Sequence, residues 1–559
     1  MNGNGSGMKP TTLLCLLLGG WWIVNLIQAG CTELANDEAY YHMFSRELAW
    51  GYFDHPPMTA LLVRMGAFLG GELGVRFFFT ILQPLYLLIL YRIIRPEQPT
   101  RRDVLLYFVI CAALPVLQLY GFIAVPDAPL LLFSALFLLC YKRFTERDSL
   151  PNALWLGLSV AALAYSKYHG ALVVFFTLVF NPRIFRQPRL YLAGGVALLL
   201  LVPHLIWQYE HDFASIRYHL AGRNGFFKFN YITEYILNIF AIFNPLFFPL
   251  YVKSWIKSKS ANPTERAIYC ITLGLIVFFL LSSIRGYVQP QWVIVSSFGF
   301  ILLLFGYARR HPRTRKYTMV SGCVTIGLIG LVRLVMIFNP IGLRFEVFDN
   351  KTSYGAIAAV AQGRPVIFGG SYAIAAKYGF YTGQPAFSQP SINYRTSQWQ
   401  YMDTDTRAAG GPVLIETGPE GADSTLHLAN GRDFSYVAGA DFRPVRKVEI
   451  AGRPLPRRVK VGETLTVPLT IFNPYDYDIG LSPESNPLVL AWGRNKEVFR
   501  EYVLPVKGTV PAGSLLRQTV RFTVPEELAS PREYRVGFTI RPRYQGYWFN
   551  SKESKVSVE

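Results

Sequence analysis

One polar segment sets the architecture of this chain: Asn36-Asp-Glu-Ala-Tyr-Tyr-His-Met-Phe-Ser-Arg-Glu-Leu-Ala-Trp-Gly-Tyr-Phe-Asp-His-Pro-Pro-Met58. It directly follows the first apolar run and is rich in acidic, basic and histidine side chains, namely Asp37, Glu38, His42, Arg46, Glu47, Asp54 and His55. Such groups are costly near hydrocarbon, so the cluster predicts a functional site at a membrane surface. The alternative is an ordinary solvated loop, which the aromatic residues and paired prolines disfavour.

The composition is that of a polytopic membrane protein. The chain has 559 residues, of which 51% are hydrophobic, 15% aromatic and 16% charged, which is too apolar for a soluble protein of this length. The net charge of +19 does not indicate nucleic-acid binding, because many basic residues lie in short loops between apolar runs and set membrane topology. The six cysteines show neither zinc-site spacing nor a disulfide framework.

Apolar runs that can cross ~30 Å of hydrocarbon recur as far as about residue 340. They predict roughly eleven transmembrane spans, the first of which is read as uncleaved and not as a signal peptide. The expected spans are about 11–30, 73–91, 103–121, one that follows the loop 122–126 and ends at about 141, 153–166, 170–180, 190–207, 233–252, 267–284, 290–308 and 317–338.

The loops rich in lysine and arginine fall on every second connection between these spans. By the positive-inside rule they are cytoplasmic, which places the N-terminus inside and the C-terminal region outside. The other loops are then exterior, and every unusual polar motif of the membrane half lies in them: 31–72, 122–126, 166–169, 208–232 and 285–289.

The pattern changes after the last apolar run. Residues 341–440 combine short β-like runs such as Val366-Ile-Phe368 with a helix expected from Ser371 to Tyr378, which predicts a small exterior α/β domain. Residues 441–559 alternate like strands with regular turns and predict an immunoglobulin-like β-sandwich. The expected membrane domain is 1–340.

Asp37 and Glu38 are the first candidates for chemistry. A carboxylate at the membrane face can accept a proton from a hydroxyl as that oxygen attacks. The alternative is structural, because Asn36 or Asp37 could cap a helix that continues through Phe44.

Asp54 and His55 add a second carboxylate and an imidazole, stiffened by the prolines that follow. The favoured role is to orient an acceptor or the first carboxylate. A divalent metal held by Asp54, His42 and His204 is a second interpretation, although their spacing fits no specific metal motif.

Three cations on the exterior side, Lys167, Arg223 and Arg285, suit a phosphate at the lipid headgroup level. The alternative to phosphate binding is that these side chains snorkel, which places their charged ends at the membrane–water interface. Asp127 is a lone acid at the entry to a span, where it is a helix cap or a substrate contact. In the soluble region, Tyr394-Arg-Thr-Ser-Gln-Trp399 is a candidate sugar site or a docking surface.

These motifs carry a family resemblance. The runs Asp37-Glu-Ala-Tyr-Tyr41, Gly51-Tyr-Phe-Asp-His-Pro-Pro57, Pro126-Asp-Ala-Pro-Leu130 and Ser166-Lys-Tyr168 resemble bacterial members of glycosyltransferase family 39. These are related to protein O-mannosyltransferases and to the lipid A aminoarabinose transferase, and share the GT-C fold. The resemblance covers roughly residues 10–400 and says nothing about the sandwich.

The resemblance implies that one sugar moves from a polyprenyl-phosphate donor to an acceptor on the exterior face of a bacterial inner membrane, with inversion at the anomeric carbon. Asp37 matches the catalytic base, Glu38 its neighbour, and Asp54 an acid that in some relatives helps to hold a metal. Arg285 is similar to the basic residue that meets the donor phosphate. His55 stands where relatives have lysine, which puts a phosphate-binding role for it in doubt.

Together, the residues and the resemblance give one set of expected site residues. Asp37, Glu38 and Asp54 are catalytic, and Arg285, Lys167 and Arg223 bind the donor phosphate. The expected substrate contacts are Tyr40, Tyr41, His55, Asp127, Tyr287, Arg395, Gln398 and Trp399. The acceptor is a glycan, lipid A or a protein, and the competing functions are a flippase and a non-catalytic binder of lipid-linked sugars.

Overall fold

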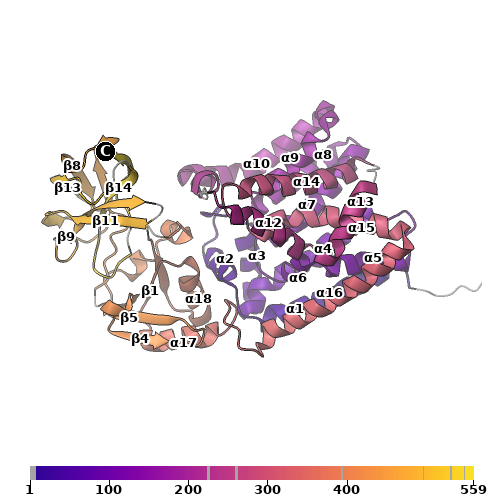
Figure 1. Cartoon of the computed structure of the whole chain (residues 1–559), viewed down its shortest axis with the longest axis horizontal. Helices are drawn as coiled ribbons and strands as arrows, with labels where there is room; N and C mark the ends of the chain where they lie inside the picture. The colour runs from indigo at the N-terminus through magenta and orange to yellow at the C-terminus, as the bar shows by residue number, and fades with distance from the viewer. Residues whose placement is uncertain are drawn as a thin grey trace, which may run out of the picture. The chain divides into compact units, whose positions relative to one another are not determined.

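The computed structural model of the protein describes residues 8–222, 227–257, 262–391, 394–439, 441–494, 497–528, 532–546 and 548–559. The chain divides into two compact units, Met1–Phe348 and Asp349–Glu559. The first is helical and the second carries the strands (Figure 1).

The helices of the first unit are α1 (Pro10–Cys31), α2 (Asn36–Arg46), α3 (Met58–Gly66), α4 (Gly71–Ile94), α5 (Arg101–Ala112), α6 (Pro115–Leu119), α7 (Asp127–Glu146), α8 (Leu150–Ser166), α9 (Gly170–Val179), α10 (Pro188–Glu210), α11 (Ala214–Arg217), α12 (Phe229–Ile242), α13 (Phe248–Lys257), α14 (Pro263–Ser283), α15 (Ser297–Arg310) and α16 (Pro312–Phe338). Among the described residues, seven helical segments are long and apolar enough to span a membrane: α1, α4, α7, α10, α14, α16 and Pro290–Arg310, which includes α15.

Two of the expected spans are formed differently. The predicted span at 103–121 breaks between α5 and α6, whereas the two shorter pieces expected at about 153–166 and 170–180 are present as the helices α8 and α9. The continuous span expected at 233–252 is instead α12 and α13, which the structure bends by 85°. Asn244 stands at this bend with φ 70°, a conformation that asparagine tolerates. Its amide donates to Ala113 O at 3.0 Å, where α5 ends.

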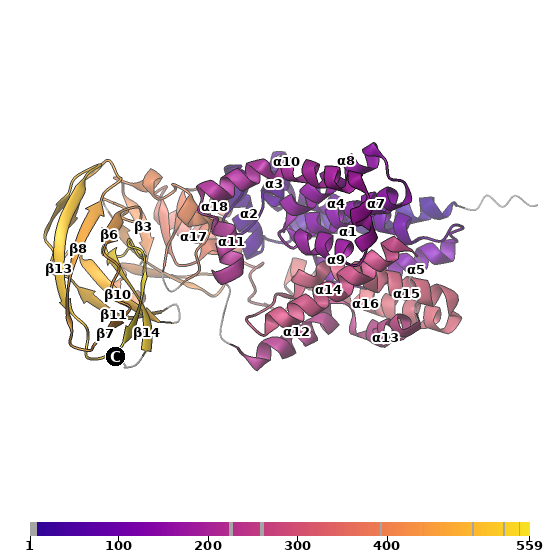
Figure 2. The same ribbon diagram turned by 90° about the horizontal axis from the view of Figure 1, so that it is seen from above.

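Close helix packing holds the bundle together. Helix α8 lies along both α7 and α10 (Figures 1 and 2). At this contact a Cβ on Gly157 would come within 2.5 Å of Ala193 O, so a small residue is needed for the two backbones to approach.

A buried polar cluster crosses the bundle between α1, α4, α6 and α16. Arg333 donates to Asn25 Oδ1 at 2.8 Å and to Gln118 Oε1 at 2.9 Å. Asn25 in turn donates to Gln83 Oε1 at 2.5 Å. Side-chain hydrogen bonds satisfy polar groups that would otherwise be stranded in hydrocarbon.

The second unit begins with an α/β layer. Its sheet has the order β2-β1-β3-β5-β4, in which β1 is parallel to β2 and β3 and the remaining pairs are antiparallel. The elements are α17 (Asn350–Ala361), β1 (Val366–Gly369), α18 (Tyr372–Thr382), β2 (Ala386–Gln389), β3 (Val413–Glu416), β4 (Ser424–His427) and β5 (Asp433–Gly439).

The rest of this unit is a β-sandwich. One sheet has the order β11-β10-β14-β15-β7 and the other β13-β8-β6, with a short β12-β9 pair beside them. Side chains from both larger sheets share one core, which includes Ile471, Val520, Trp492 and Phe538. The strands are β6 (Glu449–Gly452), β7 (Arg458–Val459), β8 (Thr464–Phe472), β9 (Ile479–Leu481), β10 (Leu488–Arg494), β11 (Glu497–Val503), β12 (Gly508–Val510), β13 (Leu515–Thr523), β14 (Arg532–Ile540) and β15 (Ser554–Val558).

Candidate active site

Glu38 is held from three directions at the start of α2. Arg76 of α4 donates to Oε1 from Nε at 2.7 Å and to Oε2 from Nη2 at 2.5 Å. The backbone N–H of Ala124 donates to Oε1 at 2.8 Å and that of Ala35 to Oε2 at 2.9 Å. Glu38 and Arg76 are both 0% exposed. A carboxylate so fully engaged fits a positioning role better than proton transfer with a substrate.

Arg76 extends this anchorage to the end of α1. Its Nη1 donates to the carbonyl oxygens of Ala29 and Thr32, and its Nη2 donates to that of Glu33. One guanidinium therefore donates hydrogen bonds both to carbonyls that a helix C-terminus leaves without partners and to the Glu38 carboxylate. It fixes the turn from α1 into α2, and with it the residue that precedes Glu38.

Asp37 lies in the first turn of α2 and is partly exposed. The expected N-cap role of Asn36 or Asp37 is wrong, because the cap position is Ala35. The Asp37 carboxylate is close enough to Asp127 and to the Tyr120 hydroxyl to act on both electrostatically. The Asp37 carboxylate is partly exposed at a fixed helix start and is therefore accessible to a substrate, whereas the Glu38 carboxylate is not.

Asp127 and Lys167 form a buried ion pair, with 2.7 Å between Oδ1 and Nζ and side chains only 4% and 6% exposed. Asp127 is the first residue of α7, and Lys167 is the C-cap residue directly after α8. Asp127 does not act as a side-chain cap there. The pairing accounts for both residues structurally, so a phosphate contact by Lys167 would compete with a buried counterion.

The Asp54 segment is fixed through its backbone. His204 Nδ1 donates to Trp50 O at 2.7 Å, Ser215 Oγ to Tyr52 O at 2.8 Å, and His219 Nε2 to Asp54 O at 3.0 Å. Asp54 itself is 3% exposed. Three carbonyls of one loop are thus held by α10 and the turns after it.

Tyr168 connects this loop to the Asp127 pair. Its hydroxyl accepts from Gln208 Nε2 at 2.9 Å, and the Asp54 carboxylate acts on it electrostatically. Because Lys167 precedes Tyr168, the short turn between α8 and α9 touches the surroundings of both Asp37 and Asp54. The structure therefore gathers motifs from four separate parts of the sequence.

The aromatic residues of α2 are packed and not open to solvent. Tyr40 and Tyr41 are 1% and 4% exposed, and both rings contact Phe44. The His55 ring lies 5.4 Å from that of Tyr41. The substrate contacts expected from Tyr40 and Tyr41 would therefore need a rearrangement, and their evident role is to shape the site.

His42 sits on the same helix. Burial, with a contribution from the charge of Arg46, lowers the pKa of His42 to about 4. The imidazole is therefore neutral near pH 7. A second buried group is Tyr52, whose pKa is raised to about 12 by burial and whose ring stacks on Phe44 at 4.3 Å.

The described residues do not fit a metal site. No three histidine, cysteine, aspartate or glutamate side chains in this part of the chain come together as ligands. The interpretation of Asp54, His42 and His204 as a metal triad has no support in this geometry.

The remaining expected cations differ in status. Arg285 lies in the turn after α14 and is exposed, while Tyr287, 49% exposed, contacts Tyr231. Arg223 lies outside the described residues.

In the second unit Trp399 is 3% exposed and Gln398 6%, and the Trp399 indole donates to Tyr372 O at 2.9 Å. The expected stacking platform at Trp399 is thus buried, while Arg395 lies over the Tyr372 ring at 4.2 Å.

Sequence interpretation missed Arg76 and the Arg333 cluster. A usable signal was present, because Arg76 and the polar side chains Asn25, Gln83 and Arg333 fall inside otherwise apolar runs, where such residues are functional candidates by default.

Comparison with known proteins supports the fold of the helical unit. Residues 54–207 match the family described as dolichyl-phosphate-mannose-protein mannosyltransferase. Among solved structures, ArnT from Cupriavidus metallidurans in the apo state aligns with a TM-score of 0.57 at 13% identity, over 77% of this chain and 97% of that one. The helical unit has the GT-C fold.

ArnT from the same organism bound to undecaprenyl phosphate aligns similarly, with a TM-score of 0.55, 14% identity and coverage of 77% and 98%. The lipid A galacturonosyltransferase RgtD of Rhizobium johnstonii is 30% identical over 224 residues, which are 38% of this chain and 46% of that protein. The chain thus spans about half the length of this curated relative. The resemblance to glycosyltransferase family 39 is confirmed, while Asp37 and Arg285 lie outside the segment 54–207.

Proposed function

We propose that the GT-C unit transfers one sugar from a polyprenyl-phosphate donor to an envelope acceptor on the exterior face of a bacterial inner membrane. The observation that carries the proposal is the rigid placement of the partly exposed Asp37 beside Asp127 and Tyr120. The GT-C relatives include a structure with undecaprenyl phosphate, which supports a lipid-linked donor.

In the proposed reaction Asp37 takes the proton of the acceptor hydroxyl as its oxygen attacks the anomeric carbon. A new glycosidic bond forms, the bond from that carbon to the phosphate oxygen breaks, and the polyprenyl phosphate leaves with the electron pair. Attack opposite the leaving group inverts the anomeric carbon. No step passes through a metal, since the described residues do not provide a site for one.

The other residues prepare this step. The Glu38–Arg76 pair fixes the backbone that carries Asp37, and the Asp127–Lys167 pair places a second charge pair beside it. Arg285, exposed in its turn, is the proposed contact for the donor phosphate, where a guanidinium suits a phosphate by charge and by geometry.

The acceptor proposed first is a lipid A-type glycolipid, because the curated relative is a lipid A galacturonosyltransferase. A galacturonosyl donor is accordingly the first to test. The orientation that follows from the basic loops puts the N-terminus in the cytoplasm and the second unit outside.

The test uses membranes with and without the protein, a panel of radiolabelled polyprenyl-phosphate sugars, and an envelope extract. We expect label to leave the polyprenyl fraction only with the protein present and to appear in a chemically stable product, whose analysis names the acceptor. A second assay uses the protein in liposomes. Label that crosses the liposome membrane while it stays on the polyprenyl lipid would instead establish a flippase.

A further inference from the structure

Helix α2 begins without a capping side chain of its own. Its N-cap residue is Ala35, which makes no side-chain hydrogen bond to the helix. The first four N–H groups of a helix have no partner within it, and alanine, unlike serine, threonine, aspartate or asparagine, cannot supply one. The N–H groups at this helix start must therefore be satisfied from elsewhere, and Asp37 lies in this turn.

Two carboxylates from different parts of the chain accept from these donors. The N–H of Ala35 donates to Glu38 Oε2 at 2.9 Å. The N–H of Asn36 donates to Glu346 Oε2 at 3.0 Å, across 310 residues of sequence. A negative charge at this end of a helix is also favoured by the helix dipole. Glu346 thus caps α2 at the residue immediately before Asp37.

Glu346 lies in the connector between α16 and the second unit, residues 339–348. Asn339 is the C-cap of α16, in a left-handed conformation with φ 43°. Its side chain donates to Leu343 O at 3.0 Å and accepts from the N–H of Leu343 at 2.7 Å. A further turn is closed by the N–H of Phe348, which donates to a carbonyl three residues earlier at 3.0 Å. Hydrogen-bonded turns before and around Glu346 therefore fix its place in the connector.

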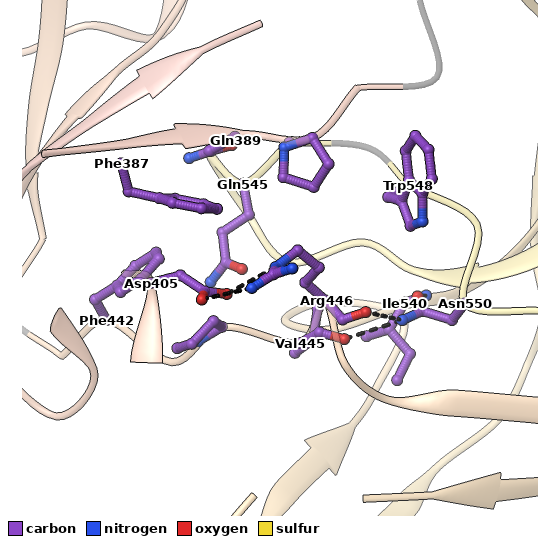
Figure 3. A pocket seen from close by; sticks show the side chains of 13 residues that line it. Phe387, Gln389, Asp405, Phe442, Val445, Arg446, Ile540, Gln545, Trp548 and Asn550 are labelled. Atoms are coloured by element: carbon purple, nitrogen blue, oxygen red, sulfur yellow. Dashed lines mark hydrogen bonds and ion pairs between the residues drawn. The ribbon is translucent and has the colours of Figure 1, made fainter. Parts of the chain in front are cut away.

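The connector leads into a second unit whose two layers are held to each other by the segment between β5 and β6. In this segment Arg446 binds both carboxylate oxygens of Asp405 in the α/β layer, at 3.0 and 2.8 Å (Figure 3). From the sandwich, Asn550 donates to Val445 O at 2.9 Å. The unit that begins directly after the connector, at Asp349, is thus one compact body. A displacement of this body would act on the connector directly.

The two carboxylates hold the first turn of α2 to different parts of the protein. Glu38 fixes it to α4 through Arg76, whereas Glu346 fixes it to the connector. We propose that Glu346 is a positioning residue for Asp37, through which the segment that leads into the second unit holds the proposed base in place. Glu346 acts through the N–H of Asn36 and not through the substrate. Its effect on catalysis rests on the proposed transfer reaction, but the contact itself does not.

The first measurement is hydrogen–deuterium exchange at the Asn36 amide, on the full-length protein in nanodiscs. Glu346→Ala removes the acceptor, and we expect exchange at this amide to become about 5- to 30-fold faster, the range for a lost helix cap. Glu346→Gln keeps a carboxamide oxygen that can accept from the same N–H, so its exchange should stay close to that of the parent. Glu47→Ala removes an exposed acidic side chain at the other end of the same helix and should leave this exchange unchanged.

The second measurement is sugar transfer from a labelled polyprenyl-phosphate donor by the same variants. A displaced base should lower kcat of Glu346→Ala about 10- to 100-fold with the donor KM unchanged. Glu346→Gln should recover most of this rate, and Glu47→Ala should match the parent. A purely structural defect would instead lower the amount of folded protein and leave kcat per folded molecule unchanged.

Equal exchange at Asn36 in Glu346→Ala and the parent would overturn the inference without any need for turnover. Faster exchange with an unchanged kcat would overturn the positioning role, as would a Glu346→Gln rate as low as that of Glu346→Ala. If the parent transfers no sugar from any donor, the proposed function fails and the positioning role fails with it. The exchange result then shows whether the contact itself was at fault.

Discussion

Arg76 binds both carboxylate oxygens of Glu38, and neither side chain is exposed to solvent. The pair joins α4 to the first turn of α2 across 38 residues of sequence. Asp37 immediately precedes Glu38 in that turn, so the position of the proposed base depends on a contact that it does not itself make.

Replacing Arg76 by methionine should strongly destabilise the protein. It leaves the Glu38 carboxylate buried without its counterion, which costs about 3–5 kcal/mol. Arg64→Met removes an exposed arginine from the nearby helix α3 and should change stability by less than ~0.5 kcal/mol. Denaturation of both variants in the same mixed micelles measures this. Equal stability of the two variants would contradict the structural role of the pair.

Lys167 and Arg285 should respond differently to substitution by glutamine. Lys167→Gln leaves Asp127 buried and unpaired and should lower the free energy of unfolding by about 3–5 kcal/mol. Arg285→Gln should leave stability nearly unchanged and raise the KM for the donor roughly 10- to 100-fold, since a hydrogen bond to a charged group contributes about 1.5–3 kcal/mol.

Unfolding curves and donor titrations on the two variants separate these roles. A Lys167→Gln protein of normal stability with a raised donor KM would return Lys167 to the phosphate site. An unchanged donor KM in Arg285→Gln would remove Arg285 from it.

His42 should make stability fall on the acid side. The pKa of His42 is lowered to about 4, first by burial and then by the charge of Arg46, against an ordinary value of about 6.5. The unfolded chain therefore binds a proton that the folded protein rejects, so this contribution is complete above about pH 6.5 and is lost as the pH falls toward 4.

The measurement is the thermal unfolding midpoint from pH 4.5 to 7.5 for the parent and His42→Gln. We expect a shallower acid-side decline in the variant, with His427→Gln as an exposed control. Parallel curves for the parent and His42→Gln would show that His42 does not sense this pH range in the folded protein.

The sequence predicts the class of fold well because apolar runs and basic loops act locally. The seven long helical segments coincide with expected spans, and the strands after Arg458 follow the alternation that predicts them. The bend at Asn244 was not predicted, since it depends on a hydrogen bond to Ala113 in another helix.

In the candidate site, too, the sequence predicts the local motifs but not the contacts that depend on tertiary packing. The motifs around Asp37, Asp54, Asp127 and Lys167 were recognised from sequence, but their partners were not. From the sequence, Lys167 is expected to be available for a phosphate, whereas in the structure it forms an ion pair with Asp127. Buried pairing over long sequence separations is set by tertiary packing, which a local pattern does not encode.

The most direct test of the central claim compares Asp37→Asn with Glu47→Gln, which removes one acidic charge from an exposed position at the end of the same helix. Both are assayed for sugar transfer from a labelled polyprenyl-phosphate donor at matched protein levels in membranes. The account predicts a rate about 10²- to 10⁴-fold lower for Asp37→Asn, the range of general base catalysis, with donor binding retained and Glu47→Gln near the parent. Parent-like transfer by Asp37→Asn would contradict it.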